Sequence, residues 1–91
     1  MTAPDHQDRW HFDDRWYLVT AFSEVGSRDG FGLELEDVAP SPGKGVVLSA
    51  FYDDSTSRIS ISSKTADPLP LDLVEQFLEE VRIRTMPRSG L

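Results

Sequence analysis

The chain has 91 residues, of which 38% are hydrophobic, and its 16 acidic and 9 basic side chains leave a net charge of −7. It contains no cysteine, which excludes disulfides and thiolate metal sites. The acidity argues against nucleic acid or an anionic membrane as the ligand, because both are polyanions. The length indicates one domain, residues 1–91, with a modest core.

The first third of the chain predicts a loose terminus followed by two strands. Residues 1–7 are polar and show no periodicity, so we expect them to be loose. Trp10 and Phe12 alternate with polar residues, which predicts a short strand ended by a tight turn at 13–14. The segment 16–22 is aromatic, β-branched and unbroken, which is typical of a central strand with both faces partly covered.

The middle of the chain alternates between turn chemistry and strand patterning. Residues 26–30 contain two glycines and polar residues that favour a turn. In 31–36 large apolar residues alternate with a glycine and two acids, which predicts a half-buried strand with Glu34 and Glu36 on its solvent side. The two prolines of 39–45 remove backbone donors and predict a loop.

Two further strands and a helix complete the pattern. Residues 46–52 and 58–62 read as strands joined by the hairpin segment 53–57. From Pro70 onward the apolar period changes from 2 to 3.6, which predicts an amphipathic helix. Its apolar stripe is wide enough to cover a sheet and consists of Leu73, Val74, Phe77, Leu78 and Val81.

The fold class expected from this pattern is α+β. Four or five antiparallel strands in meander order form the sheet, and the C-terminal helix packs on one of its faces. Residues 86–91 end the helix and are expected to fray. Ile83 lies off the apolar stripe, so it is either a rim residue or a contact with another chain.

A cluster of histidines and aspartates near the N-terminus raises the possibility of a metal site. Imidazole and carboxylate groups are proper ligands for zinc and related ions. The spacing of the two histidines does not match a helical turn, however, and the segment has no rigid element to hold a site. A solvated polar terminus is therefore the favoured interpretation, and the residues concerned are His6, His11, Asp5, Asp8, Asp13 and Asp14.

No other pattern carries catalytic chemistry. The segment 53–57 lacks the spacing of a calcium loop and reads as a turn. Both histidines lie in the first eleven residues, away from any serine with a nucleophile context, so no Ser-His-Asp arrangement is supported. The glycine-rich segments match neither phosphate-binding fingerprint. We therefore predict that the protein is not an enzyme and needs no cofactor.

What remains is a surface for protein binding. The predicted contact charges are Glu34, Glu36, Asp37, Asp53 and Asp54, which form one acidic patch if the neighbouring strands bring them together. Opposite fields steer association, so a basic protein is the partner that this patch favours.

Aromatic residues could anchor such a partner at the edge of the patch. Trp10, Trp16 and Tyr52 are the candidates, because interfaces favour these residue types. The alternative is that the tryptophans belong to the core, where large aromatic residues supply much of the buried area. We take Trp16 or Trp10 as the predicted anchor.

Residues 46–54, the strand that follows them, and residues 69–79 together resemble small actinobacterial immunity-type proteins. Proteins of that type accompany secreted polymorphic toxins and neutralise them inside the producing cell. The resemblance rests on the layout of strand, hairpin, strand and helix. It implies a cytoplasmic inhibitor with one protein partner, the toxin domain, and it carries over no catalytic residue.

These observations predict an acidic, cytoplasmic, immunity-type inhibitor that binds a toxin enzyme directly. Residues 1–6 lack the basic and apolar regions of a signal peptide, in keeping with that location. The partner is expected to be one basic protein, not a nucleic acid or a membrane, with the chain a monomer or homodimer. One alternative is a small dimeric adaptor or secretion chaperone that uses Ile83 and a strand edge. The other is a metal-dependent enzyme built on the N-terminal His/Asp cluster.

Overall fold

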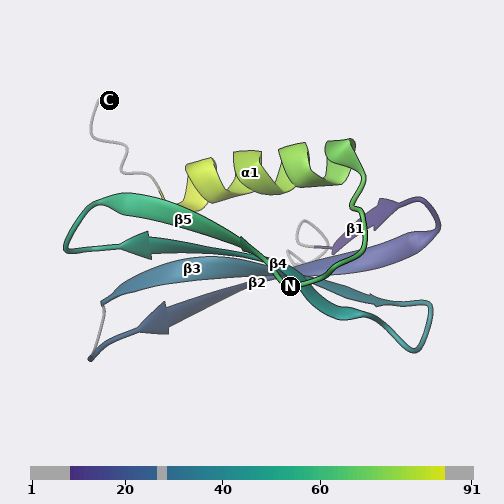
Figure 1. Cartoon of the computed structure of the whole chain (residues 1–91), viewed down its shortest axis with the longest axis horizontal. Coiled ribbons are helices and arrows are strands. Elements are labelled where there is room, and N and C mark those ends of the chain that lie inside the picture. The colour runs from purple at the N-terminus through teal and green to yellow at the C-terminus, as the bar shows by residue number, and fades with distance from the viewer. Residues whose placement is uncertain (1–8, 27–28, 86–91) are drawn as a thin grey trace, which may run out of the picture.

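The computed structural model describes residues 9–26 and 29–85, which form a five-stranded sheet and one helix (Figure 1). The predictions for 1–7 and 86–91 lie outside these residues. No helix within the described ranges is long and apolar enough to cross a membrane. The elements are β1 (Arg9–Phe12), β2 (Arg15–Glu24), β3 (Gly30–Ala39), β4 (Gly45–Asp53), β5 (Arg58–Ser63) and α1 (Leu71–Thr85).

The strands follow one another in the sheet in chain order, and every neighbouring pair is antiparallel. Asp13 and Asp14 both have positive φ angles, 51° and 67°, as the tight turn between β1 and β2 requires. Ser57, with φ of 60°, closes the turn between β4 and β5, and its N–H donates to the carbonyl oxygen of Asp53 at 2.8 Å. The predicted meander of an α+β fold is therefore confirmed.

The helix begins where the sequence predicts it. The Pro70 carbonyl accepts a hydrogen bond from the Val74 N–H at 3.2 Å, which is the first i→i−4 bond of the helix. Asp72 lies in the first turn and Arg82 and Arg84 in the last, so their charges oppose the helix dipole favourably at both ends.

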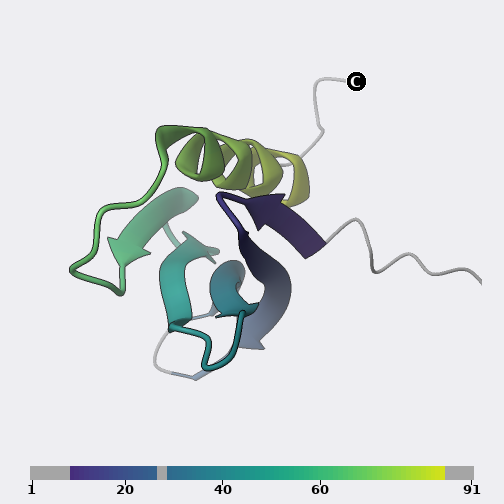
Figure 2. The same cartoon turned by 90° about the vertical axis from the view of Figure 1, so that its right-hand side faces the viewer.

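The core lies between α1 and the concave face of the sheet. Figure 2 shows the sheet curving beneath the helix, so that the edge strands β1 and β5 rise on either side of it. Leu73 and Phe77 of the helix are fully buried, as are Leu33 and Leu35 of β3 beneath them. The rest of the core cluster consists of Trp10, Tyr17, Val19, Val47, Leu48, Ala50 and Val81.

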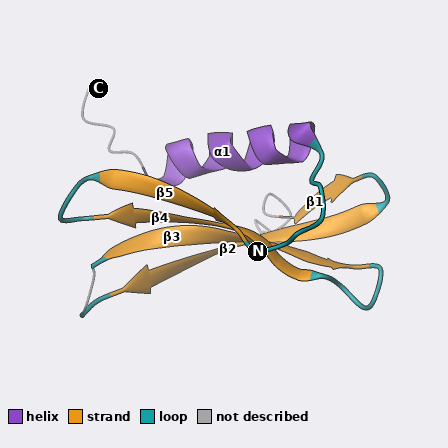
Figure 3. Ribbon diagram, viewed as in Figure 1, coloured by secondary structure: helices purple, strands orange, loops and turns teal. Residues whose placement is uncertain are grey.

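The opposite, outer face of the sheet has no helix over it in the described part of the chain (Figure 3). Phe22 and Phe51 stack across this face with their ring centroids 6.2 Å apart. A Cβ atom on Gly32 would lie 2.7 Å from the Phe22 ring, and one on Gly30 would lie 2.8 Å from the Phe51 ring. The two glycines of β3 therefore leave the room that these rings occupy.

Candidate protein-binding surface

The strand register assigns side chains to the outer face. Directly opposite residues of an antiparallel pair project from the same side of a sheet. Since Leu33 and Leu35 face the helix, their neighbours Gly32 and Glu34 face outward. Across β2, β3 and β4 the outer face consists of the rows Leu18–Glu36–Val46, Thr20–Glu34–Ser49, Phe22–Gly32–Phe51 and Glu24–Gly30–Asp53.

The acidic residues form two groups on this face, separated by the Phe22–Phe51 pair. Glu34 and Glu36 are half-buried and lie in adjacent rows. Asp53 shares their face but lies level with Gly30, about 13 Å further along the sheet at 3.3 Å per residue. The sequence therefore predicted the outward face of Glu34 and Glu36 correctly, but Asp53 lies apart from them and the three acids do not form one continuous patch.

Two further acids, Asp54 and Glu24, lie near Asp53 at the end of the sheet where β3 begins. Asp54 lies beyond β4 in the exposed turn, where its N–H donates to the Asp29 carbonyl at 2.9 Å. Glu24 flanks Gly30 on the side opposite Asp53, and sequence reasoning missed it. The signal was present, since Glu24 continues the outward alternation of Thr20 and Phe22, but the predicted strand ended two residues early.

Trp16 is the exposed aromatic residue of the outer face, with 41% of its surface accessible. The imidazole ring of His11 stacks on it, with the centroids 4.5 Å apart and the planes inclined by 10°. Next to Trp16 lies a hollow of about 330 Å³. One of the residues that line it, Leu18, stands directly opposite Glu36 in the sheet. The side chains that line the hollow are those of Arg9, Trp16, Leu18, Val38 and Ala39.

The other two aromatic candidates do not lie on this surface. Trp10 is only 7% exposed and stands opposite Tyr17 on the helix side of the sheet, so it belongs to the core. Its prediction as an anchor is wrong, and the core alternative is right for this tryptophan. Tyr52 is half-buried and stands opposite Ile59, again on the helix side.

Asp37 was predicted as a contact charge, but it is 1% exposed. Its carboxylate accepts hydrogen bonds from Arg15 Nε at 2.7 Å, from Arg15 Nη2 at 3.0 Å, and from the Lys44 N–H at 3.3 Å. Arg15 Nη2 also donates to the Pro40 carbonyl at 3.1 Å, which ties the loop after β3 to β2. The hydrogen bonds from Arg15 to the Asp37 carboxylate raise the pKa of Arg15, and the negative charge of Asp37 raises it further. Asp37 thus forms a structural ion pair with Arg15 and is not exposed for contact with a partner protein.

Asp37→Asn is expected to lower the free energy of unfolding by about 2 kcal/mol, because it removes the charge of a buried carboxylate from its partly buried hydrogen bonds to Arg15. Chemical denaturation measures the change. Glu34→Gln is the matched control on the same strand and should stay within about 0.5 kcal/mol of the wild type. Equal stabilities of the two variants would contradict the structural assignment of Asp37.

Tyr17 makes the fold sensitive to alkaline pH. Burial raises the pKa of Tyr17 above the ordinary value of 10.0, and the nearby Asp37 carboxylate raises it further. The unfolded chain therefore loses the Tyr17 proton at a lower pH than the folded chain does. The contribution of Tyr17 to the free energy of unfolding is fully present below pH 10 and is lost as the pH rises through the pKa of the folded state. Above pH 10 the wild type should lose stability more steeply than Tyr17→Phe in denaturation titrations. Parallel slopes would contradict the prediction.

The metal hypothesis finds no further support. Asp5, His6 and Asp8 lie outside the described residues, and no three potential metal ligands gather among the residues that the structure describes. The side chain of His11 is stacked on Trp16. In the 53–57 turn, one Asp53 carboxylate oxygen accepts bonds from the Ser55 N–H at 2.8 Å and the Ser55 hydroxyl at 2.7 Å, which confirms the turn interpretation.

Comparison with protein-family models, with curated proteins and with solved structures finds no significant match to this chain. The functional interpretation therefore depends on the geometry of the outer face.

Proposed function

We propose that this protein is a protein-binding module whose outer sheet face binds one basic protein partner. In its specific form the proposal is an immunity-type inhibitor that acts in the cytoplasm by binding a toxin enzyme directly. Among residues 9–26 and 29–85 the helix covers one face of the sheet and no element covers the other, which supports contact through that outer face. The proposal assigns no catalytic residue and no cofactor.

The observation that carries the proposal is the environment of Trp16. Trp16 is 41% exposed and gives the outer face a large apolar surface, whose removal from water on contact with a partner would favour binding. Stacking on His11 restricts the ring before any partner arrives, which lowers the entropy lost on binding. Tryptophan beside a pocket is the residue type that contributes most to binding energy at protein interfaces.

Glu34 and Glu36 supply the charge next to this anchor. Both are half-buried on the outer face, so a partner cation that reaches them is partly removed from water. Reversing both charges should slow association and weaken the salt dependence of binding, because acids on the contact face steer a basic partner.

The proposal can be tested by capturing partners from the producing cells with the tagged protein and with two double variants. Glu34→Lys/Glu36→Lys reverses the charges of the outer face. Glu75→Lys/Glu79→Lys reverses two exposed charges on α1 and is the matched control, since both variants change the net charge equally. We expect the wild type and the helix variant to retain one basic protein that the sheet variant loses.

Equal retention by the two variants would contradict binding through the outer face, and loss by both would indicate a dependence on net charge alone. The inhibitor form of the proposal has its own readout. The enzymatic activity of the captured partner should fall as wild-type protein is added and should persist with the sheet variant. A partner whose activity is unchanged at saturation would remove the inhibitor form.

A further inference from the structure

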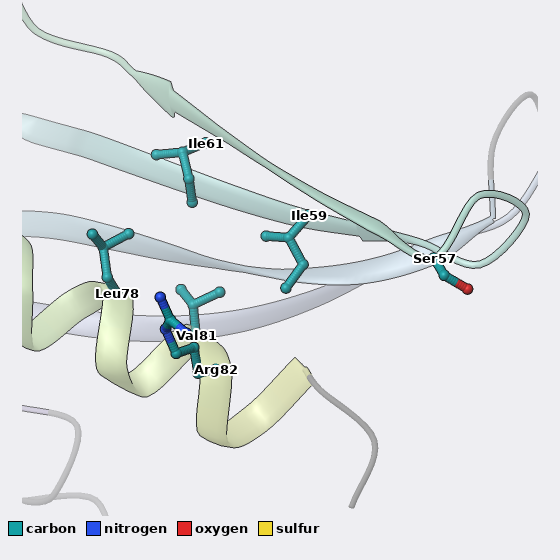
Figure 4. Close-up of a pocket in the computed structure, with 6 residues that line it drawn as sticks. All are labelled: Ser57, Ile59, Ile61, Leu78, Val81 and Arg82. Carbon is teal, nitrogen blue, oxygen red and sulfur yellow. The ribbon is translucent and has the colours of Figure 1, made fainter. Parts of the chain in front are cut away.

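An apolar groove of about 380 Å³ runs between β5 and α1, on the side of the molecule away from Trp16. Figure 4 shows Ile59 and Ile61 of β5 directed toward the helix, with Leu78 and Val81 facing them. Ile61 remains 44% exposed although it belongs to the helix side of the sheet. The helix therefore covers this edge of the sheet incompletely.

The backbone of β5 is also open along this edge. No strand in the described part of the chain pairs with the outer side of β5. The Lys64 N–H donates to the Val47 carbonyl at 2.8 Å, and antiparallel bonding alternates along a strand, so Ser60 and Ser62 also bond toward β4. The N–H and C=O groups of Ile59 and Ile61 consequently point out of the sheet.

This edge is complementary to itself. If two copies pair antiparallel with the symmetry axis at Ser60, Ile59 of one copy stands opposite Ile61 of the other, and the reverse. In this register the outward N–H and C=O groups of Ile59 of one copy can exchange hydrogen bonds with those of Ile61 of the other copy. The isoleucine side chains lie together on the helix side, where each copy has its unfilled groove.

The charges agree with the same register. Arg58 falls opposite Ser62 of the other copy, so no two cations face each other across the axis. Lys64 falls beside the 54–57 turn of the other copy, which carries the exposed acid Asp54. Shifting the register by two residues in one direction would instead place Arg58 opposite Lys64 and Ile59 opposite Ser63, so that only Ile61 would face an isoleucine.

We infer that a second copy of this chain is the partner of the β5 edge, with the two five-stranded sheets joined through antiparallel β5 strands. Both helices then lie on one side of a continuous sheet, and both outer faces lie on the other. This surface is separate from the one proposed to bind a basic protein, so either proposal can fail without the other.

The test is the mass of the full chain by sedimentation velocity from 10 μM to 1 mM at physiological salt. We expect a monomer–dimer equilibrium between 10.2 kDa and twice that mass. Ile61→Lys places a charge in the apolar groove and should raise the dimer Kd at least tenfold. Ile83→Lys is the matched control, since Ile83 is 53% exposed on α1 and does not line the groove, and its Kd should be unchanged.

A second pair of variants tests the register and leaves the groove intact. Ser62→Glu places an acid opposite Arg58 of the other copy and should tighten the dimer, whereas Ser62→Arg should weaken it. Because the dimer is symmetric, each substitution changes two cross-strand pairs, and the expected change in Kd is about twofold to thirtyfold. A monomer at 1 mM, a mass that grows beyond the dimer, or a dimer that Ile83→Lys disrupts and Ile61→Lys does not would each overturn the inference.

Discussion

Trp16→Ala is expected to weaken binding to the protein partner at least about thirtyfold, the largest effect of any single outer-face substitution. Removing a central tryptophan from a protein interface typically costs 2 kcal/mol or more of binding free energy, which corresponds to that factor. The reason lies in the geometry, because Trp16 is exposed, held by His11 and placed beside a hollow. Titration calorimetry with the captured partner measures the change.

The substitution should leave the fold intact, since Trp16 does not belong to the core cluster. A melting temperature close to that of the wild type checks this point. Ile83→Ala removes an exposed apolar side chain from α1 and serves as the control, with unchanged affinity expected. Affinities of the Trp16 variant within threefold of the wild type would rule out Trp16 as the anchor.

Phe77→Ala is expected to lower the free energy of unfolding by about 3–5 kcal/mol, the largest stability effect among the predictions. Phe77 is fully buried where α1 crosses the sheet, against the cluster that contains Leu33 and Leu35. A domain of this length has roughly 5–14 kcal/mol of total stability, so the variant loses a large part of it. Urea denaturation at neutral pH measures the difference.

Leu71→Ala is the matched control for this substitution. Leu71 belongs to the same helix but is 68% exposed, so its truncation should cost less than about 1 kcal/mol. If Phe77→Ala cost no more than Leu71→Ala, the packing of α1 on the sheet as described would be wrong.

The helix and the meander could be predicted because their signals are local. The apolar positions Leu73, Phe77 and Val81 recur every four residues, and turn residues stand between the strands. The register was not predictable to the same extent. It has two irregularities, where β3 carries the extra residue Val38 opposite β2 and β4 carries the extra residue Val47 opposite β3, and at these residues simple alternation no longer assigns a side chain to a face.

Asp37 shows why the candidate site was only partly predictable. An aspartate next to two glutamates was assigned to the surface because charged residues are rarely buried. Its burial depends on Arg15, which is 22 residues away in the sequence and on another strand. The loop that follows β3 adds the Lys44 N–H. A partner so distant in sequence leaves no local pattern.

The two tryptophans differ for a similar reason. In β1 and β2 the pairing places Trp10 opposite Tyr17 on the helix side and Trp16 opposite His11 on the outer side. The alternation of Tyr17 and Val19 as buried residues implied that Trp16 faces outward. The face of Trp10 depended on the hairpin register, which only the structure provides.

The most direct test of binding through the outer face is hydroxyl-radical footprinting of the complex with the captured partner. This method reports side-chain accessibility, and the chain provides its own references. Trp16 should be oxidised in the free protein and protected in the complex, while the buried Trp10 reacts slowly in both and Ile83 reacts equally in both. Unchanged oxidation of Trp16 in the complex, with protection of Ile83, would contradict the account and place the partner on the helix.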